Sequence, residues 1–187
     1  AIGTATTASG NNSHAEGQHT QAIGVASHTE GNTTIATGEA SHAEGSNNTA
    51  NGDHTHVEGN ENKNNAGVCN HIEGKTNIAY GNVLHVGGQG NAVSLISEQS
   101  TEEGKYTYEI VDSENPVSEY SYIVGIGNKV GKLESETSED SKCTAIFNSG
   151  SNDVTISSVN SFITGSNNVS KKLSNSIVSG TNNTQNN

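Results

Sequence analysis

One five-residue phrase recurs six times in the first half of the chain, and this repetition limits the fold more than any other feature. The phrase reads SHAEG at 13–17 and at 41–45, and SHTEG, THVEG, NHIEG and LHVGG follow in the same frame. Successive copies are fourteen residues apart, with one step of fifteen. A unit this short cannot bury a core alone and is stable only when it stacks on its neighbours. The sequence therefore predicts a solenoid.

A second glycine stands half a repeat before each phrase, so every repeat contains two turns. These glycines lie at 10, 24, 38, 52, 67 and 81. The segments between turns hold about five residues that alternate small and polar, which is the spacing of strands and too short for a helix. We expect an all-β coil in which glycine occupies the corners, because glycine takes positive φ without steric cost. The Asn-rich stretches tolerate the same conformation.

The second half of the chain fits the same frame when it is aligned on its glycines. The phrases YIVG, FNSG, FITG and IVSG then fall in line with SHAEG. We count ten repeats, which we call tiers, by their phrase-ending glycines: Gly17, Gly31, Gly45, Gly59, Gly74, Gly88, Gly125, Gly150, Gly165 and Gly180. At about 4.8 Å per stacked strand, ten tiers predict a rod segment roughly 45 to 50 Å long.

Alternation along each strand predicts which way the residues of the phrase point. Ser13 and Ala15 share one face, and their small size suits a cramped interior. The opposite face carries His14 and, two residues later, Glu16. We call the histidine position and its equivalents the ring column, which comprises His14, His28, His42, His56, His71, His85, Tyr122, Phe147, Phe162 and Ile177. A solvent-facing position would not require large apolar groups.

The composition leaves one chain short of apolar material for a core. Only 29% of its residues are hydrophobic, and it contains no Met and no Trp. Ordering a residue costs about 1 to 2 kcal/mol of backbone entropy, whereas burying a methylene returns about 0.8 kcal/mol. We therefore expect several copies to share a core through the ring column, as a closed oligomer about an axis parallel to the rod.

The pairing of an A-x-G phrase with an S-x-A-x-G phrase at a fourteen-residue step resembles the head repeats of trimeric autotransporter adhesins, the YadA-like head family. The resemblance covers nearly the whole chain apart from two insertions. It implies a left-handed parallel β-roll with coils of about fourteen residues, assembled as a homotrimer. The family's commoner phrase has aliphatic residues where this chain has His and Glu. The SHAEG wording is also similar to repeats in tail-fibre and appendage proteins of bacteriophages that infect Gram-positive hosts.

The composition also bears on the biological source of the chain. All eight basic residues are lysine and Asn is abundant, a bias typical of AT-rich genomes. We expect a structural or adhesive segment of a trimeric extracellular fibre, on a phage virion, that helps attachment to a glycan or protein receptor on the host surface. The alternatives are a bacterial surface adhesin head and a polysaccharide-degrading fibre enzyme. We expect the natural fibre to extend beyond this chain, because the chain ends in mid-repeat.

Charge and motif content exclude several partner classes. The formal net charge of −12 disfavours nucleic acid and anionic membranes as partners, and no stretch predicts membrane insertion. Catalysis by a glycosidase needs two carboxylates at a defined separation, whereas these glutamates form a regular series with none singled out. We expect no catalytic residue and no cofactor. The two cysteines, Cys69 and Cys143, lie in different tiers, and their redox state stays open.

The histidines of the ring column have two interpretations. Three chains would bring three imidazoles to the axis in every tier, and imidazole is a common transition-metal ligand. The other interpretation is structural, with each imidazole paired with a Glu at the subunit interface. Repetition favours the structural one, so we predict no metal site. Crowding of the rings lowers the histidine pKa, whereas Glu pairing raises it.

Two insertions divide the chain into three parts. Residues 1–93 form the His- and Glu-decorated tiers, 94–120 an inserted arm, and 121–187 the remaining tiers with an acidic loop at 131–142. The arm contains KYTYEIV, followed by a turn around Asn115–Pro116, and is predicted to project as a hairpin. Alternation places Tyr106, Tyr108 and Ile110 on one face as candidate recognition residues. The alternative is that the arm only clamps a neighbouring subunit. We expect the acidic loop to be solvated.

Overall fold

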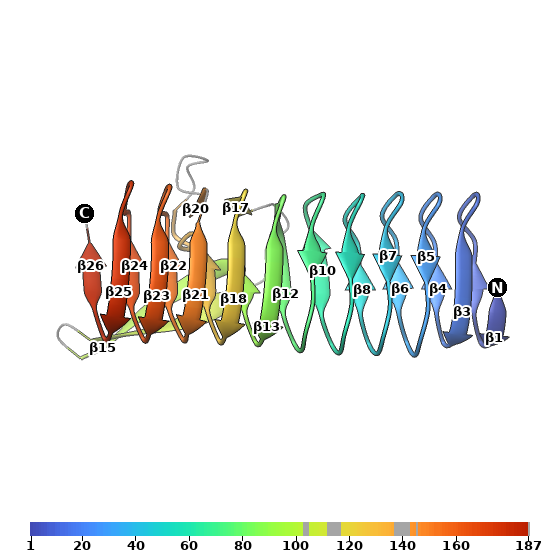
Figure 1. Ribbon diagram of the computed structural model, residues 1–187, viewed down its shortest axis with the longest axis horizontal. Helices are drawn as coiled ribbons and strands as arrows, with labels where there is room; N and C mark the ends of the chain where they lie inside the picture. Colours follow the sequence, from blue (N-terminus) through green and yellow to red (C-terminus); the bar gives the residue numbers. More distant parts are fainter. Residues whose placement is uncertain (103–104, 112–116, 137–142, 145, 187) are drawn as a thin grey trace.

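The chain winds into a long rod of short strands, with its two termini at opposite ends (Figure 1). The structure is a computed structural model and describes residues 1–102, 105–111, 117–136, 143–144 and 146–186. Within these ranges all regular secondary structure is strand and there is no helix. The prediction of an all-β repeat fold is confirmed.

The phrase-bearing strands form one long parallel sheet. It has 11 strands, and they follow chain order along the rod. The strands are β1 (Ile2–Thr4), β3 (His14–Gln18), β5 (His28–Thr29), β7 (His42–Ala43), β9 (His56–Val57), β11 (His71–Ile72), β13 (His85–Gln89), β18 (Tyr122–Ile126), β21 (Phe147–Ser151), β23 (Phe162–Ser166) and β25 (Ile177–Thr181).

The second strand of each tier belongs to a 13-stranded parallel sheet on the other side of the rod. Its main path is β2 (Thr7–Ala8), β4 (Gln21–Ala22), β6 (Ile35–Ala36), β8 (Thr49–Ala50), β10 (Lys63–Ala66), β12 (Ile78–Asn82), β14 (Ala92–Val93), β19 (Lys129–Gly131), β22 (Val154–Ile156), β24 (Val169–Lys171) and β26 (Thr184–Asn186). Two further strands, β17 (Ser118–Glu119) and β20 (Cys143–Thr144), extend from β12 off this path.

Strand register confirms that the two halves of the chain align on their glycines. Gly88 pairs with Gly125, and Gly125 pairs with Gly150, in spite of the insertions between them. The count of ten tiers was one too low for this sheet, because Gly3 in β1 pairs with Gly17. That first tier was missed because its sequence, AIGT, carries none of the Ser, His or Glu of the phrase.

The corners depend on glycine less than the sequence suggested. Ala26 and His54 both have a φ of 54°, and a non-glycine residue with positive φ recurs at one corner after another. The backbone N–H of Ala26 donates to the Asn11 carbonyl at 2.8 Å, a bond of the kind that offsets the strain of this conformation. Gly24 is required for a different reason. A Cβ there would lie 2.0 Å from the Gly38 oxygen, so close stacking of tiers excludes any side chain.

The side chains that fill the interior between the sheets are small at the N-terminal end and larger towards the C-terminal end. The phrase position after the histidine is buried throughout, and it changes from Ala15 and Ala43 to Ile72, Ile123 and Ile163. Ser27 and Ser41 are buried as well, and the hydroxyl of Ser27 donates to the Gly24 carbonyl at 2.7 Å. The predicted interior face is thus confirmed.

A ladder of buried asparagines also runs through the rod. Asn62 is typical: its Nδ2 donates to the carbonyls of Glu58 (2.6 Å) and Gly74 (2.8 Å), and its Oδ1 accepts the backbone N–H of Asn77 (2.9 Å). The ladder residues are Asn48, Asn62, Asn77, Asn91, Asn128, Asp153 and Asn168, all fully buried. Each asparagine of the ladder bonds to backbone groups of two tiers, whereas the Asp153 carboxylate only accepts hydrogen bonds from Asn168. The ladder therefore ties neighbouring tiers together.

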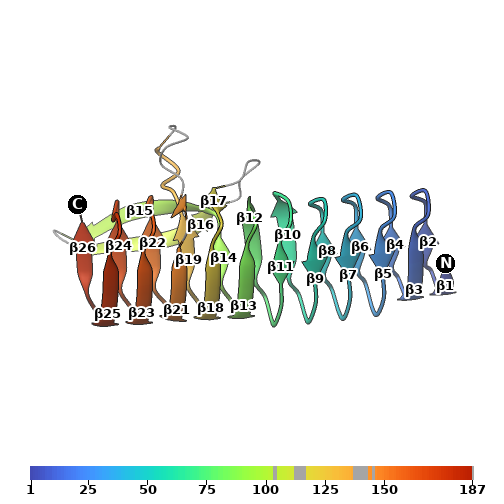
Figure 2. The same cartoon turned by 45° about the horizontal axis from the view of Figure 1, so that its top comes forward.

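The arm is a hairpin, but it lies along the rod and does not project in its described part. Strand β15 (Leu95–Glu102) pairs antiparallel with β16 (Lys105–Val111), so KYTYEIV is the second strand of the hairpin. Figure 2 shows the pair running beside the C-terminal strands of the second sheet. Ile96 packs with Val154 and Ile156, which explains why the hairpin lies flat. The predicted turn at Asn115–Pro116 falls outside the described residues.

The beginning of the acidic loop is also held against the rod. Leu133 forms a parallel bridge with Ile96, and the Glu136 carboxylate lies 3.4 Å from the Lys172 ammonium and accepts a hydrogen bond from Ser157. The prediction of a solvated loop is therefore wrong for these residues, because the rod supplies apolar and basic partners for them. The rest of the predicted loop, 137–142, lies outside the described residues.

Candidate functional site: the ring column

The ring column forms one continuous stack along the first sheet. Strand register places its ten residues in line, from His14 to Ile177. Neighbouring ring centroids from His14 to Phe162 are 4.6 to 5.1 Å apart, and the rings are within 9° of parallel at every step except one. The exception is His71 against His85, which meet at 82°. The parallel strands impose this spacing, because adjacent strands are about 4.8 Å apart.

The glutamates of the phrase lie beside the histidines and pair with them in two different ways. From His56 onwards each histidine reaches back to the glutamate of the preceding tier, as His56 Nε2 lies 3.3 Å from a Glu44 oxygen. The next two pairs, His71 with Glu58 and His85 with Glu73, are 3.2 and 3.3 Å long. The tiers of His14 and His28 differ, because these histidines lie 3.8 to 4.0 Å from the glutamate of their own tier.

Crowding and pairing shift pKa values in opposite directions along this face. Burial, with the positive charges of His56 and His28, lowers the pKa of His42, so its imidazole is neutral at pH 7. A hydrogen bond from His71 lowers the pKa of Glu58. The pKa of Glu44 is raised instead, first because its carboxyl shares a hydrogen bond with Glu30. At His42, crowding is the stronger of the two effects.

The C-terminal part of the column is apolar and half exposed. Phe147 and Phe162 are 37% and 40% exposed, Tyr122 is 41% exposed, and Ile177 is 75% exposed. Hollows in the surface beside them are lined by residues of the ring column together with Val83 and Ile146, which lie outside it. Side chains of this kind gain free energy when they are buried, so this stretch is suited to contact with another molecule.

The candidate recognition residues of the arm face the rod. Tyr108 and Ile110 are half-buried against the cluster of Ile96, Val154 and Ile156. The Lys171 ammonium lies 5.3 Å from the centre of the Tyr108 ring and pairs with the Glu98 carboxylate. These contacts hold the arm against tiers of its own chain. The side chain of Tyr106 lies outside the described residues.

Two groups of side chains on this face have donor atoms close enough to hold a metal ion. The first is His42, Glu44 and His56, and the second is Glu58, His71 and Glu73. Neither cysteine is in a disulfide: Cys69 is exposed, and Cys143 is buried. Burial raises the pKa of the Cys143 thiol to about 11, so this thiol stays protonated.

Sequence reasoning missed the asparagine ladder, although a signal for it was present. Each ladder residue stands three positions after a phrase-ending glycine, as Asn48 follows Gly45 and Asn62 follows Gly59. Asn at turns is usually explained by backbone conformation alone. Its recurrence at a single fixed offset indicates a buried, repeated hydrogen-bonding role.

The chain matches no protein-family model, and no curated protein matches it. Within the described part of the chain, no helix has the length and apolar character needed to cross a membrane.

Proposed function

We propose that this chain is a rigid segment of a homotrimeric extracellular fibre, most closely of the phage tail-fibre type, that helps attachment to a host surface. Each subunit is a left-handed β-roll with coils of about fourteen residues, and the three ring columns face the common axis. The observation that carries the proposal is the straight, half-exposed line formed by Tyr122, Phe147, Phe162 and Ile177.

Other copies of this chain are the occupants that fit this line best. The column repeats once per tier, so parallel copies in register place identical rings at the same height. Threefold closure then buries all the columns together without leaving an open edge. At the N-terminal end the same packing favours uncharged rings, and the lowered pKa of His42 supports this at that one position.

The proposed fibre role is based on the rod shape of the molecule and on the sequence of the repeat. The described residues form a long rod with a regular side-chain decoration, which suits a spacer between a particle and a surface (Figure 1). The SHAEG phrase and the lysine-only basic residues favour a phage of an AT-rich host over a bacterial adhesin. The glutamates form a regular series, so no pair is singled out for glycosidase chemistry.

Cysteine cross-linking tests the trimer axis directly. Phe162→Cys, made in a Cys69→Ser background, should oxidise to a covalent dimer on a non-reducing gel, because two of three axial thiols can pair. Ile177→Cys should behave in the same way, and it removes a side chain that makes little contact within its own chain. Cys143 can stay, because it is buried and protonated.

Lys172→Cys is the matched control, since Lys172 lies at an exposed corner outside the column. It should give no covalent dimer. Absence of dimer at both 162 and 177, or equal dimer at 172, would contradict the axial placement. Immunogold labelling of phage particles and cells with antibody to the chain tests ownership: label on phage tails supports the proposal, and label confined to the cell surface contradicts it.

A further inference from the structure

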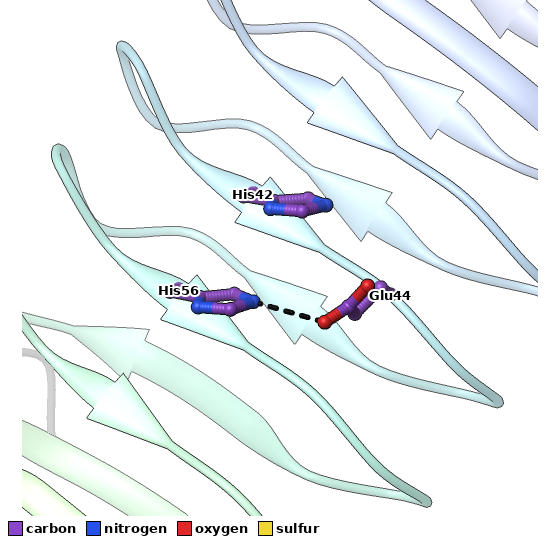
Figure 3. Close-up of side chains that lie close together, drawn as sticks. All are labelled: His42, Glu44 and His56. Atoms are coloured by element: carbon purple, nitrogen blue, oxygen red, sulfur yellow. Dashed lines mark hydrogen bonds and ion pairs between the residues drawn. The ribbon is translucent and has the colours of Figure 1, made fainter.

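We propose that His42, Glu44 and His56 form a binding site for a divalent transition-metal ion, with Zn²⁺ the best match. All three ligands come from one chain, in two neighbouring tiers, so the site does not depend on the proposed trimer. Figure 3 shows the two imidazoles stacked with their tips pointing to the same side, where Glu44 lies beside His56.

The donor atoms already have nearly the spacing that an ion needs. His56 Nε2 and the Glu44 oxygen are 3.3 Å apart, which suits two ligands each about 2.0 to 2.2 Å from one tetrahedral ion. One donor atom from each of the three residues lies within 4.8 Å of the other two. Two imidazoles and a carboxylate are a ligand set that zinc enzymes use, with water completing the coordination.

His42 is available as the third ligand. Its Nε2 is buried and has no hydrogen-bond partner in the described part of the chain. The groups that act on this ring from neighbouring tiers are His28, His56, Glu30 and Glu58, and the first influence on it is burial. Because no group of the described residues bonds to this nitrogen, it can serve as a ligand without displacing a hydrogen bond.

The two rings must tilt for both lone pairs to converge. In the stack they are parallel to within 3°, with centroids 4.7 Å apart. The column accommodates a ring turned out of the stack, since His71 and His85 meet at 82°. His56 has a side chain that is 39% exposed and therefore has room to turn.

The ligand types also predict selectivity. Two imidazole nitrogens favour Zn²⁺ over Ca²⁺ and Mg²⁺, which prefer oxygen ligands. The second group, Glu58, His71 and Glu73, has one nitrogen donor and should bind Zn²⁺ more weakly.

Calorimetric titration of the chain with Zn²⁺ at neutral pH, in a Cys69→Ser background that removes the exposed thiol, tests the proposal. We expect one tight site per chain that Mg²⁺ does not occupy. His42→Gln, Glu44→Gln and His56→Gln should each weaken it at least about tenfold, the scale seen when even a hydrogen-bonding partner of a metal ligand is lost. His19→Gln, an exposed histidine outside the column, is the control and should leave binding unchanged.

A melting experiment guards against variants that simply misfold. Zn²⁺ should raise the melting temperature of the parent and of His19→Gln equally, and it should raise that of the three site variants less, because an ion that binds only the native state stabilises it according to its affinity. Absence of saturable Zn²⁺ binding, or binding unaffected by all three substitutions, would overturn the site. One ion per three chains would also overturn it, and would instead place the ion between subunits.

Discussion

The tiers before the arm and the tiers after it share one backbone register but differ in what fills and decorates them. Before the arm, the interior holds residues such as Ala15 and Ala43, and the ring column is imidazole. After the arm, the interior holds Ile123 and Ile163, the column is aromatic, and the hairpin covers the second sheet.

This difference shows which features build the coil and which are free to change. Close stacking at glycines, corner hydrogen bonds and the asparagine ladder occur in both halves. The column residue and the interior residue vary without altering the register. One apolar cluster runs through both halves, from Ala36 to Val178, and its side chains become larger towards the C-terminal end.

The largest expected effect is a cavity in the C-terminal interior. Ile163 is fully buried, so Ile163→Ala should lower the free energy of unfolding by about 2 to 5 kcal/mol. Ala43→Gly, at the equivalent interior position of the N-terminal half, should cost only about 0.5 to 1 kcal/mol. Urea denaturation measures both. Equal losses would break the comparison between the halves.

The asparagine ladder should be about equally important in both halves. Asn62→Ala removes three hydrogen bonds, so at about 1 kcal/mol each it should cost roughly 3 kcal/mol. Asn128 makes the same three bonds in the C-terminal half, and Asn128→Ala should cost a similar amount. A loss confined to one half, measured by the same denaturation, would show that the ladder is not a common support.

A substitution at one position of the asparagine ladder should increase the stability of the fold. Asp153 replaces Asn there, and its Oδ2 is buried without a hydrogen-bond partner among the described residues, so burial raises its pKa. Folding then costs free energy as pH rises above the unfolded value of about 3.9, because the native carboxyl holds its proton longer. Asp153→Asn should stabilise by about 1 to 3 kcal/mol at pH 7.

Melting curves across the acid range check this sign. The advantage of Asp153→Asn should shrink as the pH falls below the unfolded pKa of about 3.9, where the carboxyl becomes protonated in both states. An Asn variant that is no more stable than the parent at neutral pH would contradict the assignment.

The smallest expected effect is the pH response of the imidazole half. The pKa of His42 is lowered by burial first, so the unfolded state binds more protons near the unfolded value of about 6.5. Stability should therefore fall as pH drops below about 6.5, by roughly a few tenths of a kcal/mol after solvent screening. His42→Gln should flatten this part of the curve. Thermal melts with a metal chelator present test it, and an unchanged slope would contradict it.

The periodic features of the molecule could be predicted from sequence, and the features that depend on side-chain fit could not. Alternation within SHAEG predicted that Ala15 is interior and His14 is on the opposite face, because a strand has a fixed period of two. The hairpin's position depends on Ile96 meeting Val154 and Ile156, far away in sequence, and no local pattern signals that contact. The Asn-rich stretches predicted only turns, since turn and ladder roles favour the same residue.

The glycines teach a related lesson. Gly45 has a positive φ of 95° and a Cβ there would also lie 2.2 Å from the Gly59 oxygen, whereas Gly24 is needed only because its Cβ would lie 2.0 Å from the Gly38 oxygen of the next tier. Both glycines look alike in the sequence, and only the stacking of tiers separates the two causes.

Sedimentation equilibrium over a wide range of dilution is the most direct test of the central claim, that the ring column is covered by two further copies of the chain. The account predicts a mass of three chains of 19.3 kDa each, with loss of folded structure when dilution separates them. Phe162→Ala should shift this dissociation to higher concentration. A cooperatively folded monomer at all concentrations would contradict the claim and leave the ring column as exposed surface.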